Sequence, residues 1–316
     1  MIDIWGFVVI VLGLSLFEII TSIDNAVINA EVLSTMSKRA RRWFLIWGIL
    51  IAVFLVRGAL PWLIVWLTNF DLGPIGAFTA TFSNDPRVIE SIERTTPILL
   101  MGGGVFLFLV FLHWLFLEPK NFGLRPERFF HRHGFWFFAV ASIFLVAITW
   151  VSIKLDPFIA FAAVVGSSAF FITHGFKENA EQAEKKLLHG QTSMSDWSKI
   201  LYLEVIDASF SIDGVLGAFA FTLSVPLILF GNGIGAVVLR QLTVTNIDRI
   251  KKYRYLKNGA MYSILFLGLI MMFDSLGVHI PHWLSPLVTF GTVGYFFWKS
   301  VRENKMEEKT AMKRKA

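Results

Sequence analysis

The amino-acid sequence predicts an all-α fold, a polytopic bundle of transmembrane helices with about nine spans. The chain of 316 residues is 55% hydrophobic and only 16% charged, and its mean hydropathy is +0.63. Soluble domains carry about 25% charged residues. The 32 Phe and 11 Trp residues point the same way, because aromatic side chains gather at bilayer interfaces. Composition therefore indicates a membrane protein, and the net charge of +6 needs no nucleic acid as a partner.

Nine apolar segments are each long enough to cross a hydrocarbon core of about 30 Å. The first has neither a basic n-region nor a small-residue cleavage site, so we expect a retained span rather than a signal peptide. Lys154, Asp156 and Pro157 predict a tight turn between the fourth and fifth spans. The expected spans are 4–33, 43–67, 96–117, 135–153, 156–174, 200–223, 225–245, 259–279 and 283–299.

The distribution of Lys and Arg predicts the orientation of these spans. With nine spans, 24 of the basic residues fall on one side of the membrane and three on the other, while Arg57 and Arg240 lie inside spans. Cytoplasmic loops carry the excess of positive charge. We therefore expect a multi-pass protein of the bacterial plasma (inner) membrane, with its N-terminus outside and its C-terminus in the cytoplasm.

Two repeat halves joined by a connector are the expected organisation. Spans one to three form the first half, 1–117, and spans six to nine form the second half, 200–300. Residues 118–199 hold spans four and five and a cytoplasmic linker. Residues 301–316 form a charged cytoplasmic tail.

Spans one and six carry the same acidic motif. The sequence Ser-Ile-Asp occurs at 22–24 and again at 211–213, and a gap-free alignment places Glu18 on Asp207. The expected topology makes the two segments antiparallel across the membrane. This is the arrangement of an inverted repeat, which is common in secondary transporters.

The next two spans extend the repeat. Gly48 precedes Arg57 by nine residues in span two, and Gly231 precedes Arg240 by nine residues in span seven. We therefore expect a two-fold axis in the membrane plane that relates spans one and two to spans six and seven. Each arginine should contact an acid or a backbone carbonyl, because an unpaired guanidinium inside a membrane is costly.

Helical geometry divides the polar side chains of each span between two faces. At about 100° per residue, Asp24 points about 120° away from Glu18, and Asp213 leaves the face shared by Glu204 and Asp207 in the same way. Either the two motif aspartates face another helix, or the helices unwind locally beside Asn25 and Gly214.

The acidic side chains of both motifs form an all-oxygen ligand set. Carboxylate and carbonyl oxygens suit hard cations such as Mg²⁺, Ca²⁺ and Mn²⁺, and the chain has no Cys that would favour a soft ion. The alternative is that the acids pair with the two arginines and only fix helix packing. The candidate ligands are Glu18, Asp24, Asn25, Glu204, Asp207 and Asp213, with Ser22, Ser211, Arg57 and Arg240 in support.

Two histidines and a glycine run receive other interpretations. His113 and His174 lie near the cytoplasmic ends of their spans, where a histidine is more often an interfacial residue than a ligand. The glycines at 102–104 predict close helix packing.

The stretches 16–33 and 202–214, which contain the two acidic motifs, resemble the TerC integral membrane family, and 231–243 and 253–256 resemble it as well. The resemblance is poor in 120–198. It implies a member of the LysE-like transporter superfamily that exports a metal ion, most often Mn²⁺, with the paired acidic motifs as the ion site. Other members are linked to tellurium resistance. Asn258 and Met261 stand where that branch has histidines, which favours a site of oxygen ligands.

Two functions follow as expectations. The first is a secondary transporter that exports a divalent cation, Mn²⁺ first among the candidates, with no tightly bound cofactor. The second is a membrane scaffold that docks cytoplasmic stress-response proteins through its basic loops and tail. An enzyme is not expected, because the chain has no nucleophile–base set and no His-Glu-x-x-His motif. The expected partners are the cation, the lipid bilayer and a cytoplasmic protein, and the oligomeric state stays open.

Overall fold

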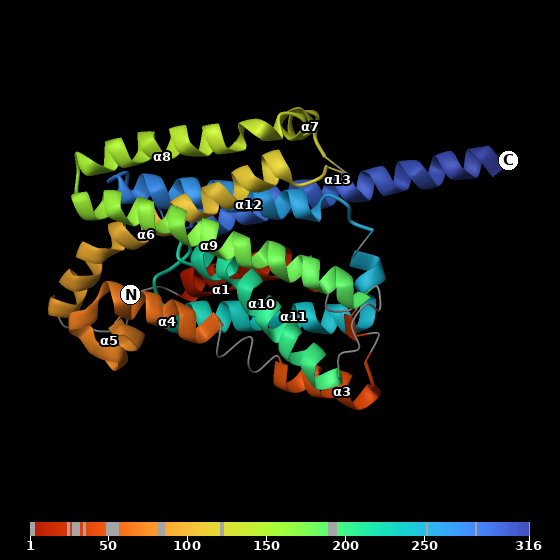
Figure 1. The fold of residues 1–316 in the computed structure, drawn as a ribbon, viewed down its shortest axis with the longest axis horizontal. Helices are drawn as coiled ribbons and strands as arrows, with labels where there is room; N and C mark the ends of the chain where they lie inside the picture. Colours follow the sequence, from red (N-terminus) through yellow and green to blue (C-terminus); the bar gives the residue numbers. More distant parts are fainter. Residues whose placement is uncertain are drawn as a thin grey trace.

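The computed structural model describes residues 4–23, 26, 32–33, 36–48, 57–80, 86–120, 123–188, 195–250, 252–281 and 283–315. Every regular element in these ranges is a helix, which confirms the all-α fold class (Figure 1). The elements are α1 (Ile4–Thr21), α3 (Lys38–Trp43), the π-helix η1 (Phe44–Gly48), α4 (Arg57–Thr68), the 3₁₀ helix η3 (Phe70–Leu72), α5 (Gly73–Thr79), α6 (Pro86–Leu117), α7 (Arg125–Arg132), the 3₁₀ helix η5 (Gly134–Trp136), α8 (Phe137–Ile153), α9 (Pro157–Leu188), α10 (Asp196–Ala218), α11 (Val225–Ile250), α12 (Leu256–Ser275) and α13 (Leu284–Lys315).

Five helical segments in the described part are long and apolar enough to cross a membrane, which makes this a membrane protein. They are Ile4–Thr21, Glu90–Leu117, Gly134–Ile153, Pro157–Phe176 and Leu256–Ser275. Two shorter apolar helices, Gly58–Thr68 and Val225–Gln241, accompany them. The expected count of nine spans stays a prediction, in part because α10 carries several carboxylates within one helix and α13 continues into a charged segment.

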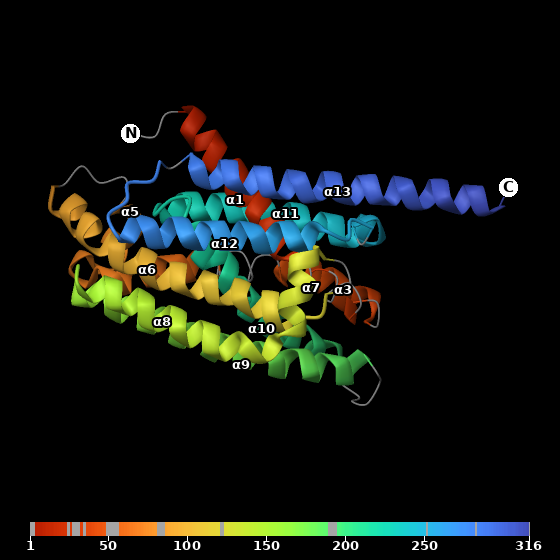
Figure 2. The ribbon, with the colours of Figure 1, turned by 90° about the horizontal axis from the view of Figure 1, so that it is seen from above.

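The helix α6 lies at the centre of the bundle. It packs against α12 and α9 and also contacts α7, α8 and α10, and Figure 2 shows it between α12 and the pair α8 and α9. Met101, Val105, Leu107 and Leu109 on α6 have no exposed surface. This buried apolar helix supports the elements that carry the polar groups described below.

The glycine run at 102–104 brings α6 close to two neighbours, as the sequence predicts. A side chain at Gly166 of α9 would collide with the backbone carbonyl of Gly102. On the other side, a Cβ at Gly104 would lie 2.9 Å from the carbonyl oxygen of Gly268 on α12. Small residues at such crossings let helices in lipid gain van der Waals contact between their backbones.

The outer faces of the bundle are apolar. On α8, Ile143, Val146 and Trp150 are each about two-thirds exposed or more. Large apolar side chains on a continuous exposed face are unfavourable in water and favourable in hydrocarbon. The predicted turn after α8 is also confirmed, since the Phe158 amide donates to Oδ1 of Asp156 at 2.7 Å where α9 begins.

The two ends of the bundle differ in charge. Figure 1 places α3, α7 and the C-terminal end of α13 at one end, and α5 and the N-terminus toward the other. The first group carries 14 of the 29 Lys and Arg residues, and α5 carries none. The grouping agrees with the expected separation of charge, and the side of the membrane to which each end belongs stays a prediction.

Candidate functional site

Helix α10 is the common wall of three buried polar sites. Its partner α1 runs antiparallel to it, because Glu18 lies at Gly214, Phe17 at Gly217 and Gly13 at Phe221. Helix α11 runs parallel to α1, and the Ser15 hydroxyl donates to the Gly231 carbonyl at 2.9 Å. The expected antiparallel neighbourhood of spans one and six is therefore present. The two-fold relation between the two pairs of spans stays a prediction.

The first site is the carboxylate of Glu18, which is only 1% exposed. The Ser22 hydroxyl donates to its Oε1 at 2.9 Å. Two glycines make room for it: a Cβ at Gly214 of α10 would lie 3.2 Å from Glu18 Oε2, and a Cβ at Gly235 of α11 would lie 2.7 Å from Glu18 Cβ. An acid on an apolar helix is thus held between two glycine surfaces, where no larger residue would leave it space.

Two further polar groups are buried on the helices that enclose Glu18. Ser211 of α10 is 2% exposed and Asn232 of α11 is fully buried. Within the described residues, the Ser211 hydroxyl and both polar atoms of the Asn232 amide have no hydrogen-bond partner. A buried polar group without a partner costs about 1–3 kcal/mol. The Ser211 hydroxyl and the Asn232 amide each contain an oxygen atom of the kind that coordinates a hard cation.

The second site surrounds Asp213, which faces away from Glu18. Helix α10 is continuous from Asp196 to Ala218, so the local unwinding considered for this position does not occur. Asp213 instead faces other helices, the first of the two expected possibilities. It lines a cavity of about 30 Å³ shared with α6, α9 and α12, together with His113 and His174.

The two histidines of this cavity were assigned to the membrane interface from the sequence. In the structure their rings are in contact, with centroids 3.7 Å apart. Nothing in the sequence marks them as a pair, because they lie on different helices and have no motif in common. The packing of α9 against α6, which approach closely at Gly102 and Gly166, brings them together.

The third site joins Glu204 of α10 to Arg240 of α11. The Arg240 guanidinium lies 3.7 Å from Glu204 Oε1, donates to the Phe44 carbonyl at 3.0 Å and covers the Phe44 ring at 4.1 Å. Gly48 leaves room for both charged groups, since a Cβ there would meet Glu204 Oε1 and the Arg240 Nη2 atom. The prediction that Arg240 contacts an acid or a carbonyl is confirmed.

These three sites are separate. Within the described part of the chain, no three His, Asp or Glu side chains lie close enough to hold one metal ion together. Glu18, Glu204 and Asp213 therefore do not meet at a single point. Asp24 and Asn25 lie outside the described residues, as do the side chains of Asp207 and Arg57.

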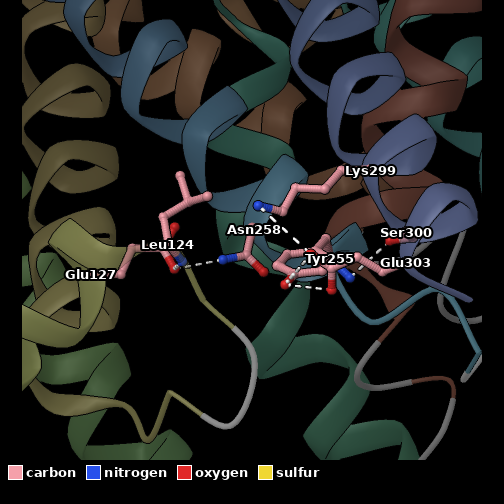
Figure 3. A network of polar contacts seen from close by, with 7 residues as sticks. All are labelled: Leu124, Glu127, Tyr255, Asn258, Lys299, Ser300 and Glu303. Carbon is pink, nitrogen blue, oxygen red and sulfur yellow. Dashed lines mark hydrogen bonds and ion pairs between the residues drawn. The ribbon is translucent and has the colours of Figure 1, made fainter. Parts of the chain in front are cut away.

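A polar network at the basic end of the bundle fixes α7 and α13 to α12 (Figure 3). The Glu127 carboxylate has no exposed surface and accepts at 2.8 Å from both the Asn258 amide and the Leu124 backbone N–H. The Tyr255 hydroxyl donates to the Glu303 carboxylate at 2.8 Å. Burial, together with this bond, raises the pKa of Tyr255 to about 12. The sequence does not predict this network, because Glu127 sits in a stretch that reads as a basic surface loop.

Lys120, beside this network, gives the structure a pH dependence. Burial lowers the pKa of Lys120 to about 8 from 10.5, although Glu118 and Glu127 act in the opposite direction. In the unfolded chain the amine keeps its ordinary pKa, so the folded state binds fewer protons between about pH 8 and 10.5. The contribution of Lys120 to the free energy of unfolding is therefore lowest below pH 8 and rises up to about pH 10.5.

We expect the melting temperature of the unmodified protein to rise relative to that of Lys120→Met as pH increases from 7.5 to 10.5. The measurement is thermal melting in detergent at a series of pH values. Lys305→Met, on the exposed part of α13, is the control and should give a flat difference. A flat difference for Lys120→Met as well would contradict the burial of a charged amine.

Comparison with known proteins gives a family and one relative. The family whose profile matches is DUF475, described as a protein of unknown function, over residues 23–307. A relative from Bacillus subtilis (strain 168), the "Uncharacterized membrane protein YceF", is 27% identical over 106 residues. The aligned part is 34% of this chain and 41% of the relative, so the match spans less than half of either protein. No solved structure matches.

The expected resemblance to the TerC family is wrong. The DUF475 profile covers most of the chain, and neither comparison gives evidence of TerC. The expectation rested mainly on the two acidic motifs within 16–33 and 202–214. Such motifs report a local need for carboxylates among apolar residues, which different membrane families can share. Any function must therefore be argued from this protein's own residues.

Proposed function

Because the chain belongs to the DUF475 family of proteins of unknown function, we propose its function from its own geometry: a secondary transporter that exports a divalent metal cation. The observation that carries the proposal is the carboxylate of Glu18, buried to 1% exposure between the glycine surfaces of α10 and α11. A charged group inside a membrane costs about 2.5–3.5 kcal/mol on insertion scales. A carboxylate that is buried at this cost suits a positive cargo.

Oxygen atoms on α1 and on its neighbours α10 and α11 would hold the cation. Glu18 supplies the charge, and the Ser22 hydroxyl, which now donates to it at 2.9 Å, would turn its lone pairs toward an ion. Ser211 and Asn232, which lack partners within the described residues, supply further oxygens. Together they replace part of the hydration shell, which hard cations require before they enter an apolar bundle.

Alternating access is the proposed mode of movement. Two contacts support an inverted repeat that could rock about the site. The repeat alignment pairs Ser15 with Glu204 and Gly48 with Gly231. In the structure Ser15 bonds Gly231, and Glu204 lies against Gly48, so equivalent positions make equivalent contacts with the opposite half. Transporters of this kind place their ion at the interface of the repeats.

The charge distribution supports the direction. We place the basic end in the cytoplasm of a bacterial cell, where positive loops remain, and the N-terminal end outside. The inward negative potential opposes the exit of a divalent cation, so export needs a driving force such as exchange for protons at the carboxylates. Mn²⁺ is the first cation to test, followed by Mg²⁺, Ca²⁺ and Zn²⁺.

The test is metal uptake by inside-out vesicles, in which the cytoplasmic face is turned outward and export appears as accumulation. We expect vesicles that contain the protein to accumulate Mn²⁺ above protein-free vesicles when a proton gradient is imposed. The four cations are compared at equal concentration. Accumulation of none of them, with or without a gradient or an imposed potential, would refute transport.

A second candidate is a scaffold that docks a cytoplasmic protein. One observation favours it: α13 continues as a helix to Lys315 and projects beyond the rest of the bundle (Figure 1). Its base is fixed by the ion pair between Arg254 and Glu307 at 2.6 Å. A scaffold does not need the buried Glu18, so retention of a cytoplasmic protein without any metal movement would favour this candidate.

A further inference from the structure

Helix α3 forms an exposed basic surface at one end of the bundle. Its six residues, Lys-Arg-Ala-Arg-Arg-Trp, include four basic side chains. Lys38, Arg39 and Arg42 are exposed, whereas the Nε atom of Arg41 donates to the Leu33 carbonyl at 3.1 Å. One short helix therefore presents three cationic side chains to the surroundings of the protein.

The start of α10 fixes this surface in place. Helix α3 contacts α10, and Figure 1 shows it beside the first turn of α10. The Ser37 hydroxyl and the Ser37 backbone N–H both donate to Oδ2 of Asp196, at 2.5 and 3.3 Å. Asp196 adds one negative charge, but the segments 37–43 and 195–201 together keep a formal charge of +4. An anionic group outside the protein is thus attracted to this place.

Two tryptophans lie where the basic residues end. The rings of Trp43, the last residue of α3, and Trp197, in the first turn of α10, are in contact, with centroids 4.9 Å apart and planes at 72°. Trp is enriched at the boundary between lipid headgroups and hydrocarbon, because its ring is apolar and its N–H is polar. The Trp pair is therefore the expected membrane boundary for both helices.

Beyond the tryptophans, both segments expose large apolar side chains. In η1, which continues α3, Ile46 is 55% exposed and Trp47 is 52% exposed. On α10, Leu201 follows Trp197 by about one helical turn and is 68% exposed. Along α3 and η1 the order is basic, aromatic and apolar. This is the order of a segment that enters a bilayer from its charged surface.

We propose that this surface binds an anionic phospholipid of the adjacent membrane leaflet. Guanidinium groups bind phosphate oxygens through two parallel hydrogen bonds, so Arg39 and Arg42 hold the headgroup, and the acyl chains cover Trp47 and Leu201. Clusters of four or more Lys and Arg beside a transmembrane helix are typical of anionic lipid recognition. The basic–aromatic patch consists of Lys38, Arg39, Arg42, Trp43 and Trp197.

A phospholipid fits both parts of the surface, whereas a soluble anion fits only one. A free phosphate or an acidic protein would pair with the arginines. Neither explains why exposed apolar side chains begin about one turn further along the same segments. The inference goes beyond the proposed function and does not depend on transport. Only the identity of the leaflet as the cytoplasmic one rests on the proposed orientation.

The basic–aromatic patch is connected to the Glu204–Arg240 ion pair. Helix α3 continues directly into η1, and the Phe44 carbonyl of η1 accepts from Arg240 at 3.0 Å. A lipid bound to α3 holds this turn in its folded position. Because it binds the folded protein and not the unfolded chain, the lipid is expected to raise the melting temperature.

The full-length protein in neutral detergent micelles tests the basic–aromatic patch. Its melting temperature is measured with phosphatidylglycerol and with phosphatidylcholine of the same acyl chains, at equal mole fraction. We expect phosphatidylglycerol to raise the melting temperature of the unmodified protein by about 3 °C or more relative to phosphatidylcholine. In the double variant Arg39→Gln with Arg42→Gln this rise should fall to less than half.

The matched control is the double variant Arg302→Gln with Lys305→Gln. Both residues are exposed on α13, and the variant loses the same charge at the same end of the bundle. It should keep the full rise. Each variant is compared with itself in the two lipids, so a general change in stability does not affect the result. No rise in the unmodified protein, or an equal loss in both double variants, would overturn the patch, because the second outcome indicates long-range charge rather than a site.

Two soluble anions separate the lipid from the other sources of negative charge. Inorganic phosphate and polyglutamate are each added to the protein in phosphatidylcholine micelles, and we expect neither to raise the melting temperature as phosphatidylglycerol does. An equal rise with phosphate would assign the arginines to a free anion, and an equal rise with polyglutamate would assign them to an acidic protein. Either result would overturn the lipid site. A rise with phosphatidylglycerol in a protein that moves no cation would support the lipid site and leave only the transporter refuted.

Discussion

Glu18→Gln is expected to reduce Mn²⁺ accumulation in inside-out vesicles to below about 1% of the unmodified rate, while the protein remains folded and inserted. Gln keeps the size and one acceptor oxygen of Glu18 but removes the charge that offsets the dehydration of the cation. A hundredfold loss corresponds to about 2.7 kcal/mol at 1.36 kcal/mol per factor of ten. This is within the cost of one uncompensated charge inside a membrane.

The same substitution separates transport from a packing role. If Glu18 only fixes the helices, Glu18→Gln would remove the free-energy cost of burying a charge. The variant would then be as stable as the unmodified protein or more stable, and any function would be intact. The transporter predicts lost accumulation with an unchanged or higher melting temperature. Glu93→Gln, exposed on α6, is the control and should transport normally. If Glu18→Gln accumulated Mn²⁺ at the unmodified rate, the transport site would be contradicted and the scaffold would be the favoured function.

Local patterns in the sequence predicted those structural features that depend on a single helix. The apolar stretches predicted helices, and the glycines at 102–104 predicted a close crossing. Helical periodicity also predicted that Asp213 leaves the face of its neighbouring acids. It could not predict which helix Asp213 faces, because that depends on how α6 and α9 pack on α10.

The unpredicted parts are contacts between distant segments. His113 and His174 form a pair because α9 packs along α6, and the two helices approach closely at Gly102 and Gly166. The buried Glu127 carboxylate accepts from Asn258 of the distant helix α12 as well as from the nearby Leu124 N–H. Neither arrangement has a period or a motif. The single all-oxygen cluster expected from the two acidic motifs is likewise divided, since Glu18, Glu204 and Asp213 lie on different sides of α10 or at different depths along it.

Arg240→Leu is expected to lower the free energy of unfolding by about 3–5 kcal/mol, the typical cost of removing one partner of a buried ion pair. The Glu204 side chain is only 9% exposed and lies 3.7 Å from the guanidinium. Without Arg240 the Glu204 carboxylate would lose this basic partner, and the Phe44 carbonyl would lose a donor. The measurement is unfolding in mixed micelles by denaturant, read by tryptophan fluorescence.

The double variant Arg240→Leu with Glu204→Leu decides whether the loss comes from an unpaired charge. Replacing both members of a buried pair by apolar residues is often neutral or stabilising, so we expect the double variant to recover most of the stability lost by Arg240→Leu. Arg302→Leu, exposed on α13, is the control and should change stability by less than about 0.5 kcal/mol. If the double variant were as unstable as Arg240→Leu, the guanidinium would stabilise the bundle through Phe44 rather than through Glu204. A recovered fold that still transports would assign the pair to structure, whereas a recovered fold without transport would place Glu204 on the path of the cation.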